Sequence, residues 1–379
     1  MKTLYLHIGT PKTATTAIQR FCQDNQNVLN GYGYCYPEFT YRYKNIGIWR
    51  NGHFLVGERR DNEGKRDFVQ ENAIFEEGFQ EIYRLFEQYD NLILSDEGIW
   101  HHGTKKGSSF LEKLQKELEK DKFAIKIIVY LRRQDDFLYS WWNQQIKEGM
   151  NSFSKLTWER MVTERPFIRL DYYGVLKQFA DVVGKDNIII RRFDQKEFFG
   201  GSIYADFLNV IGLQYSDEYQ ILTKTQNISL SKNDNEIKRI LNELPELDTK
   251  SNQVFRTVLQ DCSKSVPDDR RINMFSEKEM EEFLLEYEEQ NRRVAREYLG
   301  TEEELFDKEC RVQGKWCSDN PEMMESVIRF VGRLAIYNIN ENEKLRKENA
   351  ELKKMIKAKN SRVKNMVKSF LKHSTKEGK

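Results

Sequence analysis

Short, nearly all-apolar runs alternate with amphipathic helical patterns, and this alternation most constrains how the chain can fold. The four runs cover residues 3–9, 91–97, 124–133 and 187–193. Apolar side chains spaced by three and four residues predict helices at 15–29, 75–89 and 108–120. Strands that are apolar on both faces are typical of a buried parallel sheet. The alternation therefore predicts an α/β fold with a central parallel sheet and helices on both sides.

The stretch "HIGTPKTATT" (7–16) joins the first predicted strand to the first predicted helix. A loop in this position offers main-chain N–H groups, and the partial positive charge of the helix start, to an anion. The loop predicts a P-loop-type, three-layer α/β/α fold. The residues predicted to bind the anion are Gly9, Thr10, Pro11, Lys12, Thr13, Ala14, Thr15 and Thr16. The alternative is a simple glycine turn with a solvent-facing lysine.

The lysine of this loop is displaced. A nucleotide-hydrolase loop would have glycine at position 14 and lysine at position 15, whereas this chain has Ala14, Thr15 and an earlier Lys12. This pattern disfavours ordinary ATP or GTP hydrolysis and favours a loop that holds one phosphate and presents Lys12 near its middle. Asp96 lies at the end of the second predicted strand, where a magnesium-binding aspartate would stand, so a magnesium site stays an alternative.

A second phosphate-binding pattern follows the third predicted strand. That strand ends at Arg132 and Arg133, and Ser140 lies eight residues beyond Arg132, two turns into the next predicted helix. Arginine binds phosphate with two parallel hydrogen bonds and a permanent charge. The pair therefore predicts a second phosphate site, unless both side chains simply face solvent.

Together the two motifs resemble sulfotransferases that use 3'-phosphoadenosine 5'-phosphosulfate (PAPS). "TPKTATT" is similar to the family's 5'-phosphosulfate loop, with Ala14 in place of its usual glycine, and "LRRQDDFLYS" is similar to its 3'-phosphate motif. The resemblance covers roughly residues 1–300. It implies that Lys12, Thr15 and Thr16 bind the phosphosulfate, that Arg132 and Ser140 bind the 3'-phosphate, and that adenosine 3',5'-bisphosphate is the product.

Sulfuryl transfer calls for a base that takes the acceptor proton. The resemblance favours Glu97, because a glutamate stands at the matching strand end in carbohydrate sulfotransferases. His53 is the rival base, and Glu97 or Asp96 could instead cap the next turn. His101 and His102, just after Glu97, are weaker candidates for acceptor contacts.

Composition gives broader limits. Lys and Arg number 61 against 60 Asp and Glu, so net charge offers no argument for nucleic acid as a partner. No apolar stretch has membrane-spanning length and no signal peptide is apparent, so we expect a cytoplasmic protein. The five scattered cysteines predict free thiols, and we expect no metal site.

After about residue 215 the pattern is helical, and we expect a sulfotransferase α/β domain at 1–330 that includes this extension. Residues 331–379 predict one long C-terminal helix. An imperfect heptad seam places Leu345 and Leu352 at one position and Asn342 and Asn349 at another, which favours a parallel homodimer. The final basic segment suggests peripheral contact with the inner membrane surface. A solvated, fraying helix is the alternative.

The leading interpretation is an enzyme that moves the sulfuryl group from PAPS to a hydroxyl on a carbohydrate or glycolipid acceptor. One alternative is a P-loop kinase acting on a small molecule, which would need a magnesium site. The other is a coiled-coil scaffold that binds a nucleotide without turnover.

Overall fold

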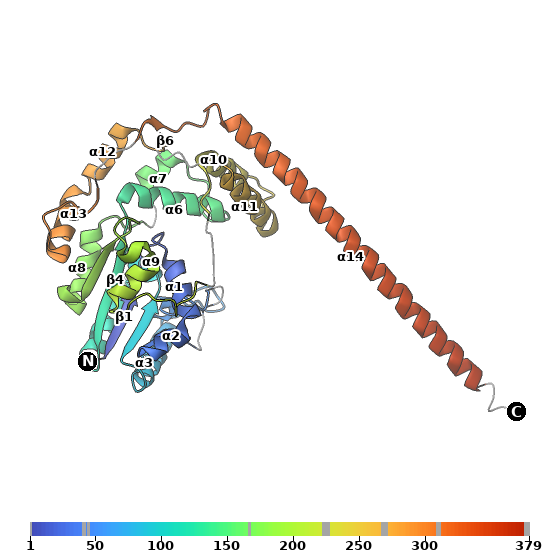
Figure 1. Cartoon of the computed structure of the whole chain (residues 1–379), viewed down its shortest axis with the longest axis horizontal. Helices are drawn as coiled ribbons and strands as arrows, with labels where there is room; N and C mark the ends of the chain where they lie inside the picture. Colours follow the sequence, from blue (N-terminus) through green and yellow to red (C-terminus); the bar gives the residue numbers. More distant parts are fainter. Residues whose placement is uncertain are drawn as a thin grey trace. The chain divides into compact units, whose positions relative to one another are not determined.

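The structure is a computed structural model, and a five-stranded parallel sheet forms the core of its first compact unit (Figure 1). The structure describes residues 2–39, 43, 46–165, 168–221, 228–266, 272–307 and 312–374, and it describes side chains up to residue 365. The strand order is β2-β3-β1-β4-β5. The strands are β1 Thr3–His7, β2 Tyr34–Cys35, β3 Asn91–Ser95, β4 Ala124–Leu131 and β5 Ile188–Arg192. The four predicted strands are confirmed. The edge strand β2 was not predicted, because two residues are too few to show a period.

Helices cover both faces of the sheet, as predicted. Alternate residues of β1 point to opposite faces, so Leu4 and Leu6 join one core and Tyr5 joins the other. The first core is covered by α3 (Phe68–Leu85), α5 (Phe110–Leu118) and α8 (Tyr172–Val183). The second core is covered by α1 (Thr15–Asp24), α2 (Gln26–Gly31) and α9 (Ile203–Val210). The three-layer α/β/α architecture is therefore confirmed.

The predicted helix at 15–29 is divided into α1 and α2 at Asn25, whose side chain donates to the carbonyl of Phe21. Other helices are α4 (Gly98–His102), α6 (Gln134–Glu148), α7 (Trp158–Glu164), α12 (Glu277–Leu285) and α13 (Glu288–Val294). Two short strands, β6 (Ile272–Asn273) and β7 (Gly314–Lys315), pair in parallel. A third core of aromatic side chains joins α6, α7 and α12.

The chain divides into two compact units. The first comprises Met1–Ile146, Asn151–Ser229 and Asp269–Cys317, and the second comprises Lys147–Met150, Leu230–Asp268 and Ser318–Lys379. In the second unit, α10 (Lys232–Leu241) and α11 (Thr249–Lys264) pack on the start of α14 (Met323–Ser374). Buried Phe330 lies with Val258 and Leu259 in the core of this unit. These contacts group α10 and α11 with the long helix, and the boundary predicted at residue 330 lies inside α14.

The predicted long C-terminal helix is present as α14, a single helix of 52 residues. Leu345 and Leu352 of the seam are 52% and 55% exposed, so this face has no covering partner among the described residues. Met366, Val367 and Phe370, which belong to the predicted basic amphipathic tail, lie outside the residues whose side chains are described.

Cys22, Cys35, Cys262 and Cys317 are free thiols, whereas Cys310 lies outside the described residues. Within the described ranges, no helix combines the length and the apolar composition needed to cross a bilayer.

Candidate functional site

The loop predicted to bind phosphate follows β1 and is fixed to β4 by hydrogen bonds. Tyr130 donates from its main-chain N–H to the carbonyl of Gly9 (2.8 Å), and Thr10 donates both its N–H and its hydroxyl to the carbonyl of Tyr130. Inside the loop, the hydroxyl of Thr13 donates to the carbonyl of Thr10. Thr10 and Thr13 are fully buried, so these two residues shape the loop, and their side chains do not face solvent.

Two non-glycine residues of this loop have left-handed backbone conformations. Lys12 has φ of 68° and Ala14 has φ of 58°, and Ala14 is the N-cap residue of α1. Glycine adopts this conformation without a steric penalty, whereas alanine pays about 1 kcal/mol. A glycine at position 14 would therefore adopt this turn without strain, whereas this chain makes the turn with an alanine that strains it.

Arg132 and Lys12 belong to the two separate motifs, and the structure brings them together. Arg132 Nη1 donates to the main-chain carbonyl of Lys12 over 3.4 Å, and the hydroxyl of Tyr172 donates to the carbonyl of Arg132. Lys12 Nζ donates to Gln144 Oε1 on α6 (3.1 Å). Gln144 lies four residues, about one helical turn, after Ser140. The loop, the end of β4 and α6 therefore meet at the carboxyl edge of the sheet.

Thr15 and Thr16 begin α1, with Thr15 buried and Thr16 exposed. Pro11 is buried, and Ser140 is partly buried on α6. The side chains of Lys12, Thr15, Thr16, Arg132 and Ser140 are all hydrogen-bond donors, and two of them are cations. A set of donors that includes two cations fits an anionic ligand better than it fits a metal ion.

The two carboxylates after β3 have different environments. Asp96 is fully buried and accepts hydrogen bonds from Arg50 Nε and Nη2, both at 2.9 Å, from His53 Nδ1 (3.1 Å) and from the N–H of Gly98 (2.7 Å). Burial acts to raise the pKa of Asp96, but the hydrogen bond from His53 and the charge of Arg50 outweigh it and lower the pKa. Asp96 therefore stays ionised and caps the turn.

Glu97 is the carboxylate that borders the loop. A methyl group built on Gly9 would lie 3.2 Å from Glu97 Cβ, so the two residues are in direct contact. Gln19 of α1 donates to Glu97 Oε2 (2.9 Å), and Arg50 lies 3.5 Å from Oε1. The Glu97 side chain is 22% exposed and makes no capping bond to α4. It is therefore accessible at the edge of the loop.

His53, the rival base, is held by Asp96 through Nδ1, which leaves Nε2 as the nitrogen that could accept a proton. Its ring packs edge-on against Tyr43 at 4.9 Å between centroids. His53 and Arg50 thus both contact Asp96, and Arg50 also connects Asp96 to Glu97.

Three residues of this cluster were not predicted. Gln19 lies one turn after Thr15 and Gln144 lies one turn after Ser140, so helical spacing from the motif residues could have indicated both. Arg50 lies in an irregular segment without a motif, and no pattern in the sequence connects it to Asp96.

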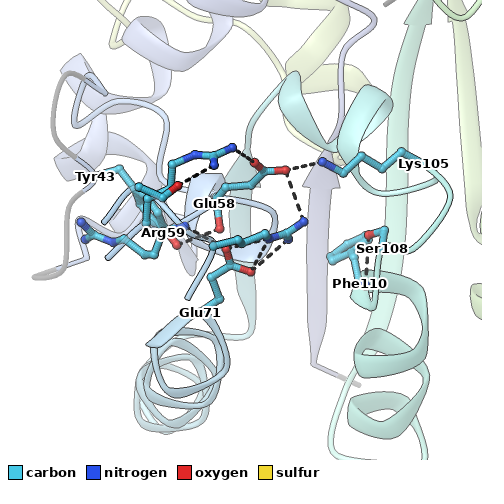
Figure 2. Close-up of polar contacts among 11 residues, drawn as sticks. Tyr43, Glu58, Arg59, Glu71, Lys105, Ser108 and Phe110 are labelled. Carbon is cyan, nitrogen blue, oxygen red and sulfur yellow. Dashed lines mark hydrogen bonds and ion pairs between the residues drawn. The ribbon is translucent and has the colours of Figure 1, made fainter. Parts of the chain in front are cut away.

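A network of ion pairs supports the segment that follows His53 (Figure 2). Glu58 pairs with Lys105 and Arg66, and Arg66 also pairs with Glu71 of α3. Glu71 additionally accepts the N–H of Arg59 (2.8 Å). These contacts fix the chain after His53 to α3 and to the connection between α4 and α5. Among the described residues, no three His, Cys, Asp or Glu side chains gather closely enough to hold a metal ion.

Comparison with known proteins gives limited matches. No protein-family model matches the chain. A protein from Archaeoglobus fulgidus, described as uncharacterized, is 27% identical over 203 residues, and the chain spans about half of its length (50% of each chain). The crystal structure of a sulfotransferase from Alicyclobacillus acidocaldarius is similar with a TM-score of 0.36 and 13% identity, over 60% of this chain and 87% of the other.

Proposed function

We propose that the chain is a PAPS-dependent sulfotransferase that transfers a sulfuryl group to an acceptor hydroxyl. The observation that supports this most is the contact between Arg132 and the carbonyl of Lys12. It joins two phosphate-binding patterns that lie 120 residues apart in the sequence. A ligand with a 3'-phosphate and a 5'-phosphosulfate needs two such sites side by side.

In this proposal each motif holds one phosphate. Arg132 and Ser140 bind the 3'-phosphate, and residues 9–16 with the start of α1 bind the 5' end. PAPS supplies the sulfuryl group when it is bound. Lys12 neutralises the negative charge that develops on the bridging oxygen as its bond to sulfur breaks, which is where electrostatic stabilisation is worth most.

Glu97 is the proposed base. Its carboxylate takes the proton of the acceptor hydroxyl while the oxygen of that hydroxyl forms its bond to sulfur. Contact with Gly9 supports this role, because it places Glu97 beside the loop. Asp96 is a poor alternative, since Arg50, His53 and the N–H of Gly98 already bind its oxygens.

The proposed acceptor is a carbohydrate, either a polysaccharide or a lipid-linked glycan, and this choice rests on the family resemblance and the carboxylate base. We further propose that the enzyme works in the cytoplasm, and that the basic end of α14 brings it to the inner membrane surface where such a glycan is built. Flotation with anionic vesicles, comparing the full chain with a chain ending at residue 340, tests that location.

Thermal shift measurements test the donor. Adenosine 3',5'-bisphosphate should raise the melting temperature more than ATP with magnesium does, and Arg132→Glu should abolish that shift. Arg160→Glu is a matched control, because Arg160 is an exposed residue of α7 that pairs with Glu164. A larger stabilisation by ATP with magnesium would favour the kinase alternative. Bisphosphate binding without transfer to any glycan from labelled PAPS would favour the scaffold.

A further inference from the structure

A cavity of about 590 Å³ lies in the first unit, between the end of α4 and the start of α8. This volume is in the range of small-molecule sites. Its lining includes the basic side chains of His101, His102, Lys105, Arg165 and Arg169. Leu170, Val175 and Tyr287 add apolar surface. None of these residues belongs to the two phosphate motifs.

His101 is the least satisfied polar group of this cavity. Both ring nitrogens are buried, and neither has a hydrogen-bond partner among the described residues. Burial, together with the neighbouring charges of His102 and Arg169, lowers the pKa of His101 to about 3, so the ring is neutral at pH 7. A neutral imidazole offers one N–H donor and one acceptor nitrogen, which suits a hydroxyl. Both nitrogens are shielded from solvent, so a ligand hydroxyl reaches one of them only when the His101 ring turns toward the cavity. Unpartnered buried polar groups are costly, so a bound ligand favours that turn.

The surroundings of His101 connect this cavity to the proposed reaction centre. His101 lies four residues, about one helical turn, after Glu97. Its ring packs against Trp141 at 5.5 Å between centroids, and Trp141 directly follows Ser140. The indole Nε1 of Trp141 is also buried without a partner in the described part of the chain. One wall of the cavity therefore comes from α4, the helix that follows Glu97, and His101 of this helix contacts α6, which carries Ser140.

The basic side chains of the cavity differ in whether a carboxylate pairs with them. Lys105 pairs with Glu58, and Arg165 pairs with Glu286 and also donates to the hydroxyl of Tyr287. Arg169 is partly buried and has no carboxylate partner among the described residues. Asp171, the acid in the lining, is the N-cap of α8 and accepts the N–H of Gly174. Arg169 is therefore the cation that is available to an anion.

We propose that this cavity binds the acceptor and that the acceptor is an anionic sugar, with its carboxylate or phosphate on Arg169 and a hydroxyl on His101. The inference rests on the proposed sulfotransferase function and narrows the acceptor from carbohydrates in general to acidic ones. A bidentate guanidinium contact would provide the selectivity, because a neutral sugar leaves Arg169 unpaired.

Calorimetric titration of the full chain tests this, both with and without saturating adenosine 3',5'-bisphosphate. Glucuronate probes binding of a sugar carboxylate, glucose 6-phosphate probes binding of a sugar phosphate, and glucose is the neutral reference. At least one of the two anions should bind more tightly than glucose by about tenfold or more, because a hydrogen bond to a charged group strengthens binding by about that factor. Equal affinity for glucose, or no heat with either anion, overturns the inference.

The variant Arg169→Gln should bind the anion about tenfold to one hundredfold more weakly. The rise in its melting temperature on adding adenosine 3',5'-bisphosphate should equal that of the parent chain. Arg160→Gln should change neither property. Arg169→Lys is the second variant, and it should recover part of the affinity because it keeps the charge but loses the planar fork. Unchanged anion binding in Arg169→Gln overturns the inference. The parent chain could bind the anion through Arg169 and yet fail to bind the bisphosphate. That result would contradict the proposed sulfuryl donor and leave the anionic acceptor site standing.

Discussion

Arg132 donates a hydrogen bond to the main-chain carbonyl of Lys12, and this contact joins the carboxyl end of β4 to the middle of the β1–α1 loop. The hydroxyl of Tyr172 holds the carbonyl of Arg132 from α8. The lysine side chain extends toward Gln144 on α6. A lysine that occupied position 15 instead would begin α1 and could not occupy this position between the loop and α6. The displaced lysine thus has a defined structural place.

Replacing Lys12 with methionine should reduce transfer from PAPS by about a hundredfold or more, because an electrostatic contact to a developing charge is worth several kcal/mol. Binding of the bisphosphate product should fall far less, since that ligand lacks the bond to sulfur. Single-turnover rates and calorimetry separate the two effects. Equal losses in rate and affinity would show that Lys12 only binds the ligand.

Exchanging Glu97 for glutamine should abolish transfer while the bisphosphate affinity stays within a few fold. The amide keeps the shape and can still contact Gln19 and Arg50, but it cannot accept the acceptor proton. His53→Gln is the matched comparison, because it removes the rival base from the same cluster. Rapid transfer by Glu97→Gln together with an inactive His53→Gln would assign the base to His53.

Exchanging Ala14 for glycine should leave bisphosphate binding intact and raise stability by up to about 1 kcal/mol, because the left-handed conformation no longer strains a side chain. Ala14→Val should reduce both stability and binding, since β-branched residues tolerate this conformation poorly. Denaturant unfolding and bisphosphate titration measure the two effects. A stabilising valine would mean that position 14 is not left-handed in solution.

The fold was predicted from the hydrophobic pattern, because β1, β3, β4 and β5 each contain a run of at least three apolar residues and their helices have clear apolar faces. The strand-loop-helix placement of the two motifs was also predictable, since each motif consists of neighbouring residues in one segment, and its binding of phosphate stays a prediction. The contacts of Asp96 could not be predicted in the same way. They depend on Arg50, which lies 46 residues earlier in an irregular segment, and on His53, which lies 43 residues earlier at the start of a single 3-10 turn. The placement of Phe330 against α11 likewise depends on tertiary packing, and no local pattern indicates it.

Stability should fall as the pH drops below about 6.5, and His7 should account for part of this loss. His7 is fully buried on β1, and burial lowers its pKa to about 3, whereas the unfolded chain has the ordinary value near 6.5. Between these two values the unfolded chain binds a proton that the folded chain does not. The free energy of unfolding should therefore decrease by about 1.4 kcal/mol per pH unit for this group.

The variant His7→Asn keeps a polar group near Ser95, which contacts His7 Nδ1 at 2.8 Å. Chemical denaturation at pH 7.5 and pH 5.5 should show a smaller loss in the variant than in the parent chain, by about 1.4 kcal/mol. The comparison concerns the difference between the two pH values, so a variant that is less stable overall remains informative. An identical loss in both chains would mean that His7 is protonated when folded.

The exposed seam of α14 should form a parallel coiled-coil homodimer. With Asn342 and Asn349 at the a positions, Leu345 and Leu352 take the d positions. Glu341 and Glu348 then fall at g positions, and Arg346 and Lys353 fall at the e positions five residues later. In a parallel dimer each g residue faces the e' residue five positions on, so both pairs attract. The asparagines pair across the seam only when the two helices are in register.

Sizing with light scattering should give a dimer for the parent chain, and replacing Leu345 and Leu352 with aspartate should give a monomer. The control exchanges Lys347 and Lys354 for aspartate, because these f positions face away from the seam. Glu348→Lys should weaken the dimer, and adding Lys353→Glu should restore it if the helices are parallel and in register. A monomeric parent chain, or a dimer that survives both leucine exchanges, would contradict the coiled coil. A dimer that Glu348→Lys leaves unchanged would contradict its parallel register.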